Sequence, residues 1–568
     1  MAKSWGDAAQ PDVVGGCGRC GDHSHPRLET VRARRRVRIL VDNVTAMTRL
    51  LDVVDLFEGD FRVALDFVWN SSDPQPNGLA ELFAAKGVFP VHPRCEREHH
   101  LAITAGHSGL RDLTAPILSL PHGIRYTKVV PEARKPGSPE ARKPGSPEAF
   151  GLSPELLLAD GRPIPSAIVL SHDEQLARLR AAVPKAADVA VVAGDPCYDR
   201  LRASVPWRLR YRLALGADAD QTVVAISSTH RADSLLGELS ALYERLLSEL
   251  PVDEYRVVTI LHPHIWNEHT PHQIRLWLAP YRRAGLMVVP PEQGWRAALV
   301  AADLLIGDHG SVTTYGAALG LPTALAVFPE ASVAPDSAVA LLGSQAPRLD
   351  LGQPILPQLR KTIAEHTPES SAAVHQMITS RPDEAAERLR ELCYSMLDLA
   401  EPRTEPGVPP DTVAGLPDGN WLWRPTAMHV SGRVHSGREI SLTRHSAEMV
   451  PVDRIPERSH LVVTADHPGP RQRAVADVLV LTEAEQWGRH AETWLGEAIS
   501  AHPGLQLAAA VRGDSCIVRT RGGDQARLSG TDDPVLYASA AFEWLASGRE
   551  LADLSPGLAV NGRPVAVS

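Results

Sequence analysis

Two histidines follow apolar runs of the sequence and stand where they could act on a bound ligand. His122 precedes Gly123 and follows the apolar run 116–120, and His262 precedes Pro263 directly after the run 256–261. Histidine titrates near neutral pH, so it can act as a general acid or base. If the runs are buried strands, both histidines lie at the carboxyl end of a sheet, where α/β folds bind ligands. The plainer interpretation of His122 is a turn residue hydrogen-bonded to a backbone carbonyl, and His264 is the spare candidate beside His262.

A third segment, Thr229-His230-Arg231, carries hydroxyl and guanidinium groups after the apolar run 222–226. An arginine fork binds a phosphate oxygen pair in a bidentate manner, so Thr229 and Arg231 are candidate phosphate ligands. The alternative is that Ser228 or Thr229 caps a helix while Arg231 is solvated.

The fourth segment, Asp308-His309-Gly310-Ser311, lies between the apolar run 303–306 and a predicted helix over 313–319. The first N–H groups of a helix have no intrahelical partner, and Gly310 would let a phosphate approach them while Ser311 adds a hydroxyl. The segment is neither a Walker loop nor a dinucleotide fingerprint, because neither spacing is present. The competing interpretation is that Ser311 only caps its own helix.

Short apolar runs that alternate with helical periodicity position these segments. One series is 37–41, 63–68, 116–120, 167–170 and 189–193, and the second is 222–226, 256–261, 286–289, 303–306 and 323–328. Continuous apolar strands between amphipathic helices are typical of parallel sheets covered on both faces. We therefore predict an α/β protein with two doubly wound domains. A helix over 382–399, capped by Asp383, is expected to close the second one.

The sequence also predicts a division of the chain. We expect a disordered tail over 1–30, a first domain over 31–205, a second over 206–400, a proline-rich linker over 401–418 and an α+β domain over 419–568. Within the first domain, 131–147 holds a tandem octapeptide with two prolines per unit, which predicts a mobile loop. The last domain shows strand-like runs at 460–464, 477–481, 506–511 and 515–519, with helices near 483–500 and 534–546. Its chain end predicts a hairpin that turns at Asn561-Gly562.

Composition limits the partners and the compartment. The chain has 568 residues and a formal charge of −10, with 58 basic and 68 acidic residues, which argues against a nucleic acid partner. Its six cysteines do not form a disulfide framework, and no signal peptide or membrane span is visible. We expect a cytoplasmic protein and leave peripheral contact with the inner face of the membrane open.

A cluster of zinc-type ligands, Cys17, Cys20, His23 and His25, lies in the N-terminal tail. Structural zinc sites usually take two ligand pairs from separated elements, so this short cluster is a weak zinc candidate. We otherwise expect no metal site, because no carboxylate cluster is visible and Asp308 alone would hold magnesium poorly.

Five segments, in order along residues 37–400, resemble motifs of the CDP-glycerol glycerophosphotransferase family, the teichoic-acid primase and polymerase group with a GT-B fold. They are His122-Gly123 with Lys128, Gly194-Asp-Pro196-Cys-Tyr-Asp199, Thr229-His230-Arg231, Leu261-His262-Pro263 and Gly307-Asp308-His309-Gly310-Ser311. The resemblance implies two Rossmann-like domains, the first on the acceptor side and the second holding the nucleotide donor. It also implies a role in the biosynthesis of a cell-wall polymer.

The same resemblance implies roles for individual residues. His122 would be the general base on the acceptor, and His262 would hold or protonate the donor's phosphates. The donor's phosphates and nucleotide would be bound by Arg231, Thr229, Ser311, Gly310 and Asp308, with Gly123, Lys128 and His264 nearby. The donor would be a nucleotide-activated small molecule such as CDP-glycerol, and no further cofactor is expected.

Three positions depart from the family's motifs, and two hypotheses follow. Ile124 replaces a threonine, Leu261 replaces an arginine and Gly310 replaces a serine. The first hypothesis is a transferase that moves a phosphoalcohol, or a sugar, to a hydroxyl of a polymer or small molecule. The second is a GT-B-like protein that binds a nucleotide or a polymer without catalysis. Residues 419–568 show no catalytic constellation. For this region we expect recognition of an acceptor or of a partner protein.

Overall fold

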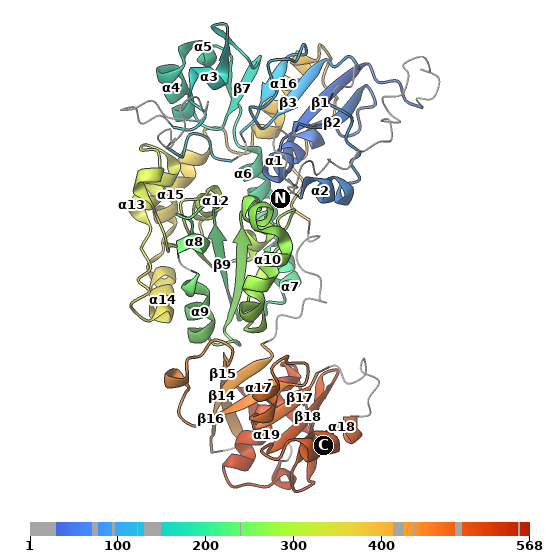
Figure 1. Ribbon diagram of the computed structural model, residues 1–568, viewed down its shortest axis with the longest axis vertical. Coiled ribbons are helices and arrows are strands. Elements are labelled where there is room, and N and C mark those ends of the chain that lie inside the picture. The colour runs from blue at the N-terminus through green and yellow to red at the C-terminus, as the bar shows by residue number, and fades with distance from the viewer. Residues whose placement is uncertain are drawn as a thin grey trace, which may run out of the picture.

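Three large sheets are stacked along the long axis of the protein (Figure 1). The computed structural model describes residues 30–70, 78–93, 97–121, 123–129, 149–238, 240–412, 425–436, 438–482, 491–554 and 557–568. The first sheet lies at the top of Figure 1, the second in the middle and a closed sheet at the bottom. Among the described residues, no helix combines the length and the apolar character needed to cross a membrane.

The first sheet has six parallel strands in the order β2-β1-β3-β4-β7-β8. They are β1 (Arg35–Val41), β2 (Val63–Trp69), β3 (Leu101–Thr104), β4 (Ile117–Ser119), β7 (Ala167–Leu170) and β8 (Ala190–Val192). A two-stranded ribbon, β5 (Leu158–Ala159) and β6 (Arg162–Pro163), stands apart. The five runs predicted as strands of this series are all present, whereas β3 was not predicted.

The second sheet has five parallel strands in the order β11-β10-β9-β12-β13. They are β9 (Thr222–Ser228), β10 (Tyr255–Leu261), β11 (Met287–Val289), β12 (Leu304–Gly307) and β13 (Thr323–Leu325). From β9 the chain adds β10 and β11 on one side of this strand, and it then returns to add β12 and β13 on the other side. The carboxyl ends of β9 and β12 form the topological switch point of this sheet, because their connections leave in opposite directions there. This edge is called the crevice.

Helices cover both parallel sheets, as expected for strands that are buried on both faces. The helices before the closed sheet are α1 (Val44–Val54), α2 (Leu79–Ala85), α3 (Pro154–Leu157), α4 (Asp173–Ala182), α5 (Pro184–Ala187), α6 (Pro196–Ser204), α7 (Arg208–Ala214), α8 (Leu235–Glu238), α9 (Ala241–Glu249), α10 (Pro263–Arg283), α11 (Trp295–Ala301), α12 (Ser311–Ala318), α13 (Ala338–Gln345), α14 (Ile355–Glu365), α15 (Pro368–Ile378) and α16 (Ala385–Met396). The predicted α/β architecture with parallel sheets is therefore confirmed.

The helix predicted to close the second sheet lies on the first one. Leu389, Cys393 and Tyr394 of α16 are buried in the core cluster that contains Val37 and Ile39 of β1, and Figure 1 shows α16 beside β3. The predicted cap is also wrong. The carboxylate of Asp199 accepts hydrogen bonds from the N–H groups of Asp383 and Ala385 at the start of α16, at 3.0 and 3.1 Å.

The last part of the chain forms a closed sheet of nine strands in the order β14-β15-β21-β22-β20-β19-β18-β17-β16. Its elements are β14 (Ala427–Val434), β15 (Glu439–Ser446), β16 (Ser459–Thr464), α17 (Pro470–Ala474), β17 (Val478–Leu481), α18 (Ala491–Ala501), β18 (Leu507–Arg512), β19 (Ser515–Thr520), β20 (Gln525–Ser529), α19 (Pro534–Ala546), β21 (Leu558–Val560) and β22 (Arg563–Val567). The strands at the four predicted runs and the hairpin at Asn561-Gly562 are present.

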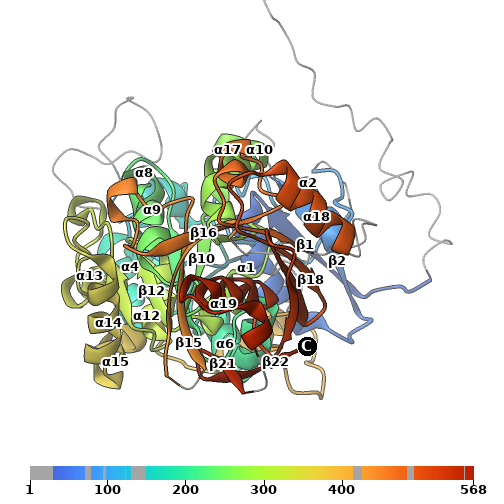
Figure 2. The same cartoon turned by 90° about the horizontal axis from the view of Figure 1, so that it is seen from below.

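The closure of this sheet was not predicted from the sequence. Helix α19 is buried on every side, and its Leu536, Tyr537 and Trp544 pack in one core with residues of both ends of the strand order. Figure 2 shows α19 surrounded by the strands of the closed sheet. A helix that is apolar all round needs such an enclosing surface.

Buried ion pairs join the three tiers. Asp52 of α1 accepts hydrogen bonds from Arg296 of α11 at 2.6 Å and from Arg200 of α6 at 3.0 Å, and its side chain is 2% exposed. At the lower junction, Arg444 of β15 is paired with Asp253 and Asp533, at 2.5 and 2.9 Å.

The predicted linker is packed where the structure describes it. The carbonyl of Asp411 accepts a 2.7 Å hydrogen bond from the Tyr211 hydroxyl, and that of Pro409 accepts one from Arg200 at 3.1 Å. Residues 413–418 of that stretch lie outside the described residues.

Candidate functional site

Three loops meet at the crevice of the second sheet and bring most of the predicted site residues together. Thr229, His230 and Arg231 follow β9, His262 and His264 follow β10, and residues 308–311 follow β12. Since β9 lies between β10 and β12, the loops are neighbours at one edge of the sheet. The register of each strand, set by its buried apolar residues, fixes where each loop begins.

The rings of three histidines are in contact at this edge. The ring centroids of His230 and His262 are 4.5 Å apart, those of His230 and His264 are 4.9 Å apart, and His262 and His264 stack at 5.0 Å. His230 comes from the loop after β9, so the cluster joins two strands. The sequence analysis did not name His230 as a site residue, although it stands inside a motif that was singled out.

His262 is held in a defined orientation by the helix that it begins. It is the N-cap of α10, and its Nδ1 accepts a hydrogen bond from the His264 N–H at 3.1 Å. A neutral imidazole that accepts through Nδ1 carries its proton on Nε2. The contact with the His264 N–H therefore favours the tautomer of His262 that carries its proton on Nε2.

Asp308 stabilises the crevice from inside. Its side chain is fully buried, and its Oδ2 accepts hydrogen bonds from the N–H and hydroxyl groups of Thr229, at 2.7 and 2.9 Å, and from the Leu235 N–H at 3.1 Å. These contacts fix the loop after β9 to the end of β12. The Thr229 hydroxyl already donates to Asp308. This contact argues against the prediction that Asp308 and Thr229 bind donor phosphate.

Gly310 is required by packing and not by the approach of a ligand. A Cβ at this position would lie 2.6 Å from Cγ2 of Thr229 and 3.1 Å from Oδ1 of Asp308. The space beside Gly310 is thus filled by the protein, which differs from the sequence interpretation that a phosphate occupies it.

Ser311 does not cap its helix. Gly310 is the N-cap residue of α12 and makes no side-chain cap bond, while Oγ of Ser311 accepts a 3.4 Å hydrogen bond from the Ile124 N–H. The Ser311 hydroxyl therefore faces the segment that follows the first sheet. The capping alternative is wrong, and the N–H groups at the start of α12 remain in position for an anion.

Residues 123–129 of the first half of the chain face this crevice. A Cβ at Gly123 would lie 3.1 Å from Oγ of Ser311, and Ile124 is buried in the core of the second sheet. Lys128 forms an isolated bridge with Val333. His122, the predicted base, lies outside the described residues, between Pro121 and Gly123.

Positive groups surround the histidines and shift their pKa values. Burial is the main cause that lowers the pKa of His230 to about 3, and the nearby Lys128, His264 and Arg231 lower it further. Burial also lowers the pKa of Lys128, assisted by Arg231. The crevice thus favours a neutral His230 ring, which would gain a proton if an anion entered.

His309 adds a buried imidazole that the sequence analysis did not name as a site residue. It is 4% exposed, its Nδ1 has no hydrogen-bond partner among the described residues, and burial lowers its pKa despite the adjacent Asp308. Asp233, which accepts a hydrogen bond from Ser332 at 3.0 Å, raises the pKa of His309.

The segment Gly194–Asp199 has a structural role. Asp195 is the N-cap of α6, accepting from the N–H groups of Cys197 and Tyr198, and it also accepts from the Tyr315 hydroxyl. Asp199 caps α16, and a Cβ at Gly194 would lie 2.7 Å from the Arg381 carbonyl oxygen. These residues connect helices of both sheets and carry no site of their own.

The zinc candidate Cys17, Cys20, His23 and His25 lies outside the described residues. Within the described part of the chain, no group of three or more His, Cys, Asp or Glu side chains is arranged to hold a metal ion.

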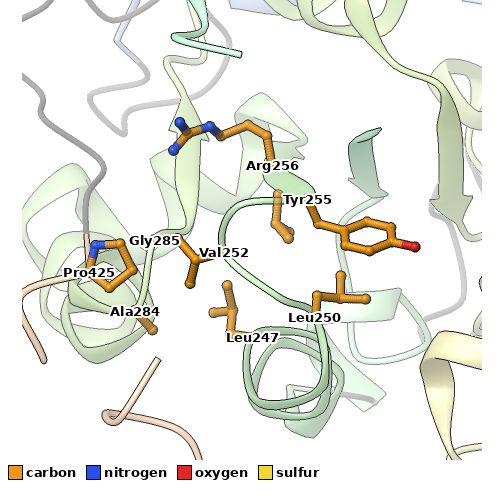
Figure 3. A pocket seen from close by; sticks show the side chains of 9 residues that line it. Leu247, Leu250, Val252, Tyr255, Arg256, Ala284, Gly285 and Pro425 are labelled. Atoms are coloured by element: carbon orange, nitrogen blue, oxygen red, sulfur yellow. The ribbon is translucent and has the colours of Figure 1, made fainter. Parts of the chain in front are cut away.

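Two cavities differ in their relation to the crevice. One is small and partly open to solvent, lies next to the crevice and is lined by Arg49, Leu120, Gly123, Asp195 and Tyr315, among others. The other, also small and partly open, lies near the amino end of β10, where Pro425 approaches it (Figure 3). In Figure 3 the ends of Tyr255 and Arg256 point away from the leucines of that cavity.

Solved structures similar to this chain include cell-wall polymer and nucleotide-sugar enzymes. A wall teichoic acid polymerase, TagF, aligns with 65% of this chain and 90% of its own at 14% identity and a TM-score of 0.43. The MnaA protein of S. aureus with UDP aligns with 66% of this chain and 100% of its own at 11% identity and a TM-score of 0.39. A UDP-GlcNAc 2-epimerase of Neisseria meningitidis, bound to UDP-GlcNAc, aligns with 64% of this chain and 100% of its own at 11% identity and a TM-score of 0.40.

No protein-family model and no curated protein sequence matches the chain. At the TM-scores above, the likeness to solved structures identifies neither a reaction nor a ligand. The chemistry has to be inferred from the side chains of the crevice.

Proposed function

We propose that the chain is a transferase that binds a nucleotide-activated donor in the crevice of the second sheet and moves its phosphoalcohol group to an acceptor hydroxyl. One observation carries the proposal. Three imidazoles in ring contact, His230, His262 and His264, lie at the carboxyl edge of a doubly wound sheet, with Lys128 and Arg231 beside them. The ring cluster combines imidazole N–H groups with cations and contains no carboxylate. Such a set of groups suits the diphosphate of a nucleotide-activated substrate.

The charges at this edge of the sheet favour an anion. Lys128 and Arg231 supply positive charge, and the helix α12 begins at Ser311 on the same side. Burial lowers the pKa of His230 and of His309, so these two rings stay neutral until an anion compensates for their desolvation. A diphosphate would satisfy the N–H groups and raise the pKa values of the imidazoles at once.

In the proposed step, the acceptor oxygen bonds to the phosphorus that carries the alcohol, and the phosphoanhydride bond to the other phosphorus breaks. The hydroxyl proton goes to a base, for which His122 remains the prediction, and a nucleoside monophosphate leaves. His262, whose Nδ1 accepts the His264 N–H, would offer Nε2–H to a phosphate oxygen. Most of the rate enhancement in such a site comes from positioning and charge stabilisation.

Binding without transfer is the second candidate, and it is favoured by the way the departing residues are packed. Ile124 and Leu261 are 8% and 3% exposed and belong to cores of the second sheet, so they supply no polar group to the crevice. A site with fewer donors holds its ligand without the charge stabilisation that transfer needs.

The experiment is incubation with CDP-glycerol, CDP-ribitol and UDP-sugars, followed by separation of the released nucleotides. Release of CMP supports phosphoalcohol transfer, whereas release of CDP or UDP indicates transfer of a glycosyl or alcohol group without its phosphate. Lys128→Gln and Arg231→Gln should each lower turnover at least tenfold, while His272→Ala, an exposed histidine on α10, should leave it unchanged. Tight binding with no released nucleotide across the panel would contradict transfer and support the second candidate.

A further inference from the structure

An arginine with two unused donors is buried next to the crevice. Arg49 lies in the middle of α1 and is 8% exposed, yet its Nε and Nη1 have no hydrogen-bond partner among the described residues. Its ion pair with Asp52 spans 3.9 Å. A buried guanidinium is costly when its N–H groups are not satisfied, so its retention calls for an explanation.

The unsatisfied donors border a cavity. Arg49 lines a small cavity, partly open to solvent, together with Leu120, Pro121, Gly123 and Tyr315, among others. The guanidinium carbon lies 5.4 Å from the ring centroid of Trp295 and 5.6 Å from that of Tyr315. Aromatic rings on its faces leave the edge of a guanidinium, where its N–H groups are, for a ligand.

The charged neighbours of Arg49 are already engaged with each other. Asp52 is bound by Arg296 and Arg200, at 2.6 and 3.0 Å, so it offers Arg49 only the longer contact. Asp195 lines the same cavity, but its two oxygens accept from backbone N–H groups of α6 and from the Tyr315 hydroxyl. Among the described residues of this cluster, Arg49 has two donors without a hydrogen-bond partner, Nε and Nη1, whereas Arg296 has one, its Nε.

We propose that Arg49 binds a single oxyanion, a phosphate or a carboxylate, that belongs to the acceptor substrate. The acceptor assignment rests on the proposed function, whereas the anion site itself rests on Arg49 and its cavity. The cavity borders Gly123, whose neighbour Ile124 bonds to Ser311, and Tyr315 follows Ser311 by one turn of α12. An acceptor held at Arg49 would therefore lie beside the donor's phosphates. The nearby Asp195 and Asp52 favour a ligand with one negative charge over a more highly charged one.

The test is titration of the full chain with sn-glycerol 3-phosphate, D-glycerate and glycerol, by calorimetry at constant ionic strength. Glycerol 3-phosphate and glycerate distinguish a phosphate from a carboxylate, and glycerol is the neutral control. Arg49→Met should raise the Kd for the binding anion at least tenfold. Arg49→Lys, which keeps the charge but lacks Nε and the planar fork, should raise it about threefold to tenfold. The melting temperature of Arg49→Met should equal or exceed that of the wild type, because an unsatisfied buried charge is removed.

Arg200→Met is the matched control, since Arg200 binds the same Asp52 but is fully engaged in ion pairs with Asp52 and Asp55. It should lower the melting temperature and leave the Kd unchanged. A phosphate also suits the donor crevice, so the titration is repeated in an Arg231→Gln background, where the effect of Arg49→Met should be the same size.

The inference is overturned if the wild type binds neither anion, or if Arg49→Met leaves the Kd unchanged. An equal loss of affinity in Arg200→Met would overturn it too. If Arg49→Met does not fold, Arg49→Lys decides by the same criterion. Turnover of CDP-glycerol reports on the proposed function separately, because Arg49-dependent anion binding does not require turnover.

Discussion

The hydroxyl of Tyr315 donates a 2.7 Å hydrogen bond to the carboxylate of Asp195, and both residues are buried. Tyr315 lies in α12, which begins at the crevice, and Asp195 caps α6, the first helix after the first sheet. This contact fixes the start of α12 relative to the segment that would carry the acceptor.

Tyr315→Phe should therefore destabilise the protein. Loss of a hydrogen bond to a buried carboxylate costs about 1.5–3 kcal/mol, and the ring itself is retained. Urea unfolding measures the change. Tyr243→Phe, which removes a 2.8 Å hydroxyl–hydroxyl bond to Thr259, is the control and should cost about 0.5–1.5 kcal/mol. An equal or smaller loss in Tyr315→Phe would show that the Asp195 contact does not have the strength inferred here.

Ser311→Ala should separate ligand binding from helix capping. Because the Ser311 hydroxyl caps nothing and accepts only a long, 3.4 Å hydrogen bond from the Ile124 N–H, its removal should cost no more than about 0.5 kcal/mol of unfolding free energy. As a phosphate donor it would contribute about 1 kcal/mol, so the affinity for CDP or UDP should fall roughly fivefold.

Ser337→Ala is the matched control for this substitution. Ser337 caps α13, accepting from the Ala340 N–H at 3.2 Å, and its loss should cost about 1 kcal/mol of stability without any effect on nucleotide binding. Unaltered nucleotide affinity in Ser311→Ala would remove Ser311 from the donor site.

Gly310→Ala should destabilise the crevice by about 1–3 kcal/mol, because the new Cβ would overlap the methyl group of Thr229. Thr229→Ser removes that methyl group and keeps the hydroxyl that donates to Asp308. In the Thr229→Ser background the cost of Gly310→Ala should fall by at least half, which a double-mutant cycle of unfolding free energies measures. Strictly additive costs would show that Thr229 is not what excludes a side chain at position 310.

Donor affinity should increase as the pH falls from 8 to 5.5. The pKa of His230 is about 3 in the unliganded crevice, well below the usual value for histidine, so the ring is neutral across this range. A bound diphosphate raises that pKa, so the complex takes up a proton and is stabilised as the pH falls. The limit is about tenfold in affinity per pH unit for each proton taken up.

Calorimetry with CDP-glycerol or UDP-glucose in buffers of different ionisation enthalpy measures this uptake, since neither diphosphate diester titrates in the range. His230→Gln should flatten the pH dependence, and His272→Gln should preserve it. Affinity that is independent of pH in the wild type would mean that no anion reaches the imidazoles.

The sequence by itself determined the parallel sheets and the order of the loops that carry the histidines. Strands such as β9 and β12 are continuous apolar runs that can only be buried on both faces, and a polar residue after such a run must emerge at the sheet's edge. For this reason His262 and Ser311 were predicted at the crevice before any contact was known. The proposed domain boundaries stay predictions of the same kind.

Tertiary structure decided what each of these residues does there. Asp308 and Gly310 have the composition of a phosphate loop, but packing between β9 and β12 buries the carboxylate and fills the space beside the glycine. Helix α16 has an apolar face that suits either sheet, and only its contact with β1 places it on the first. Nothing in the sequence around Arg49 distinguishes it from other helical arginines, and only its packing against Trp295 of α11 and Tyr315 of α12 shows that it is enclosed. Local patterns set secondary structure through periodicity, whereas these assignments depend on contacts between segments far apart in the sequence, whose partners the periodicity does not specify.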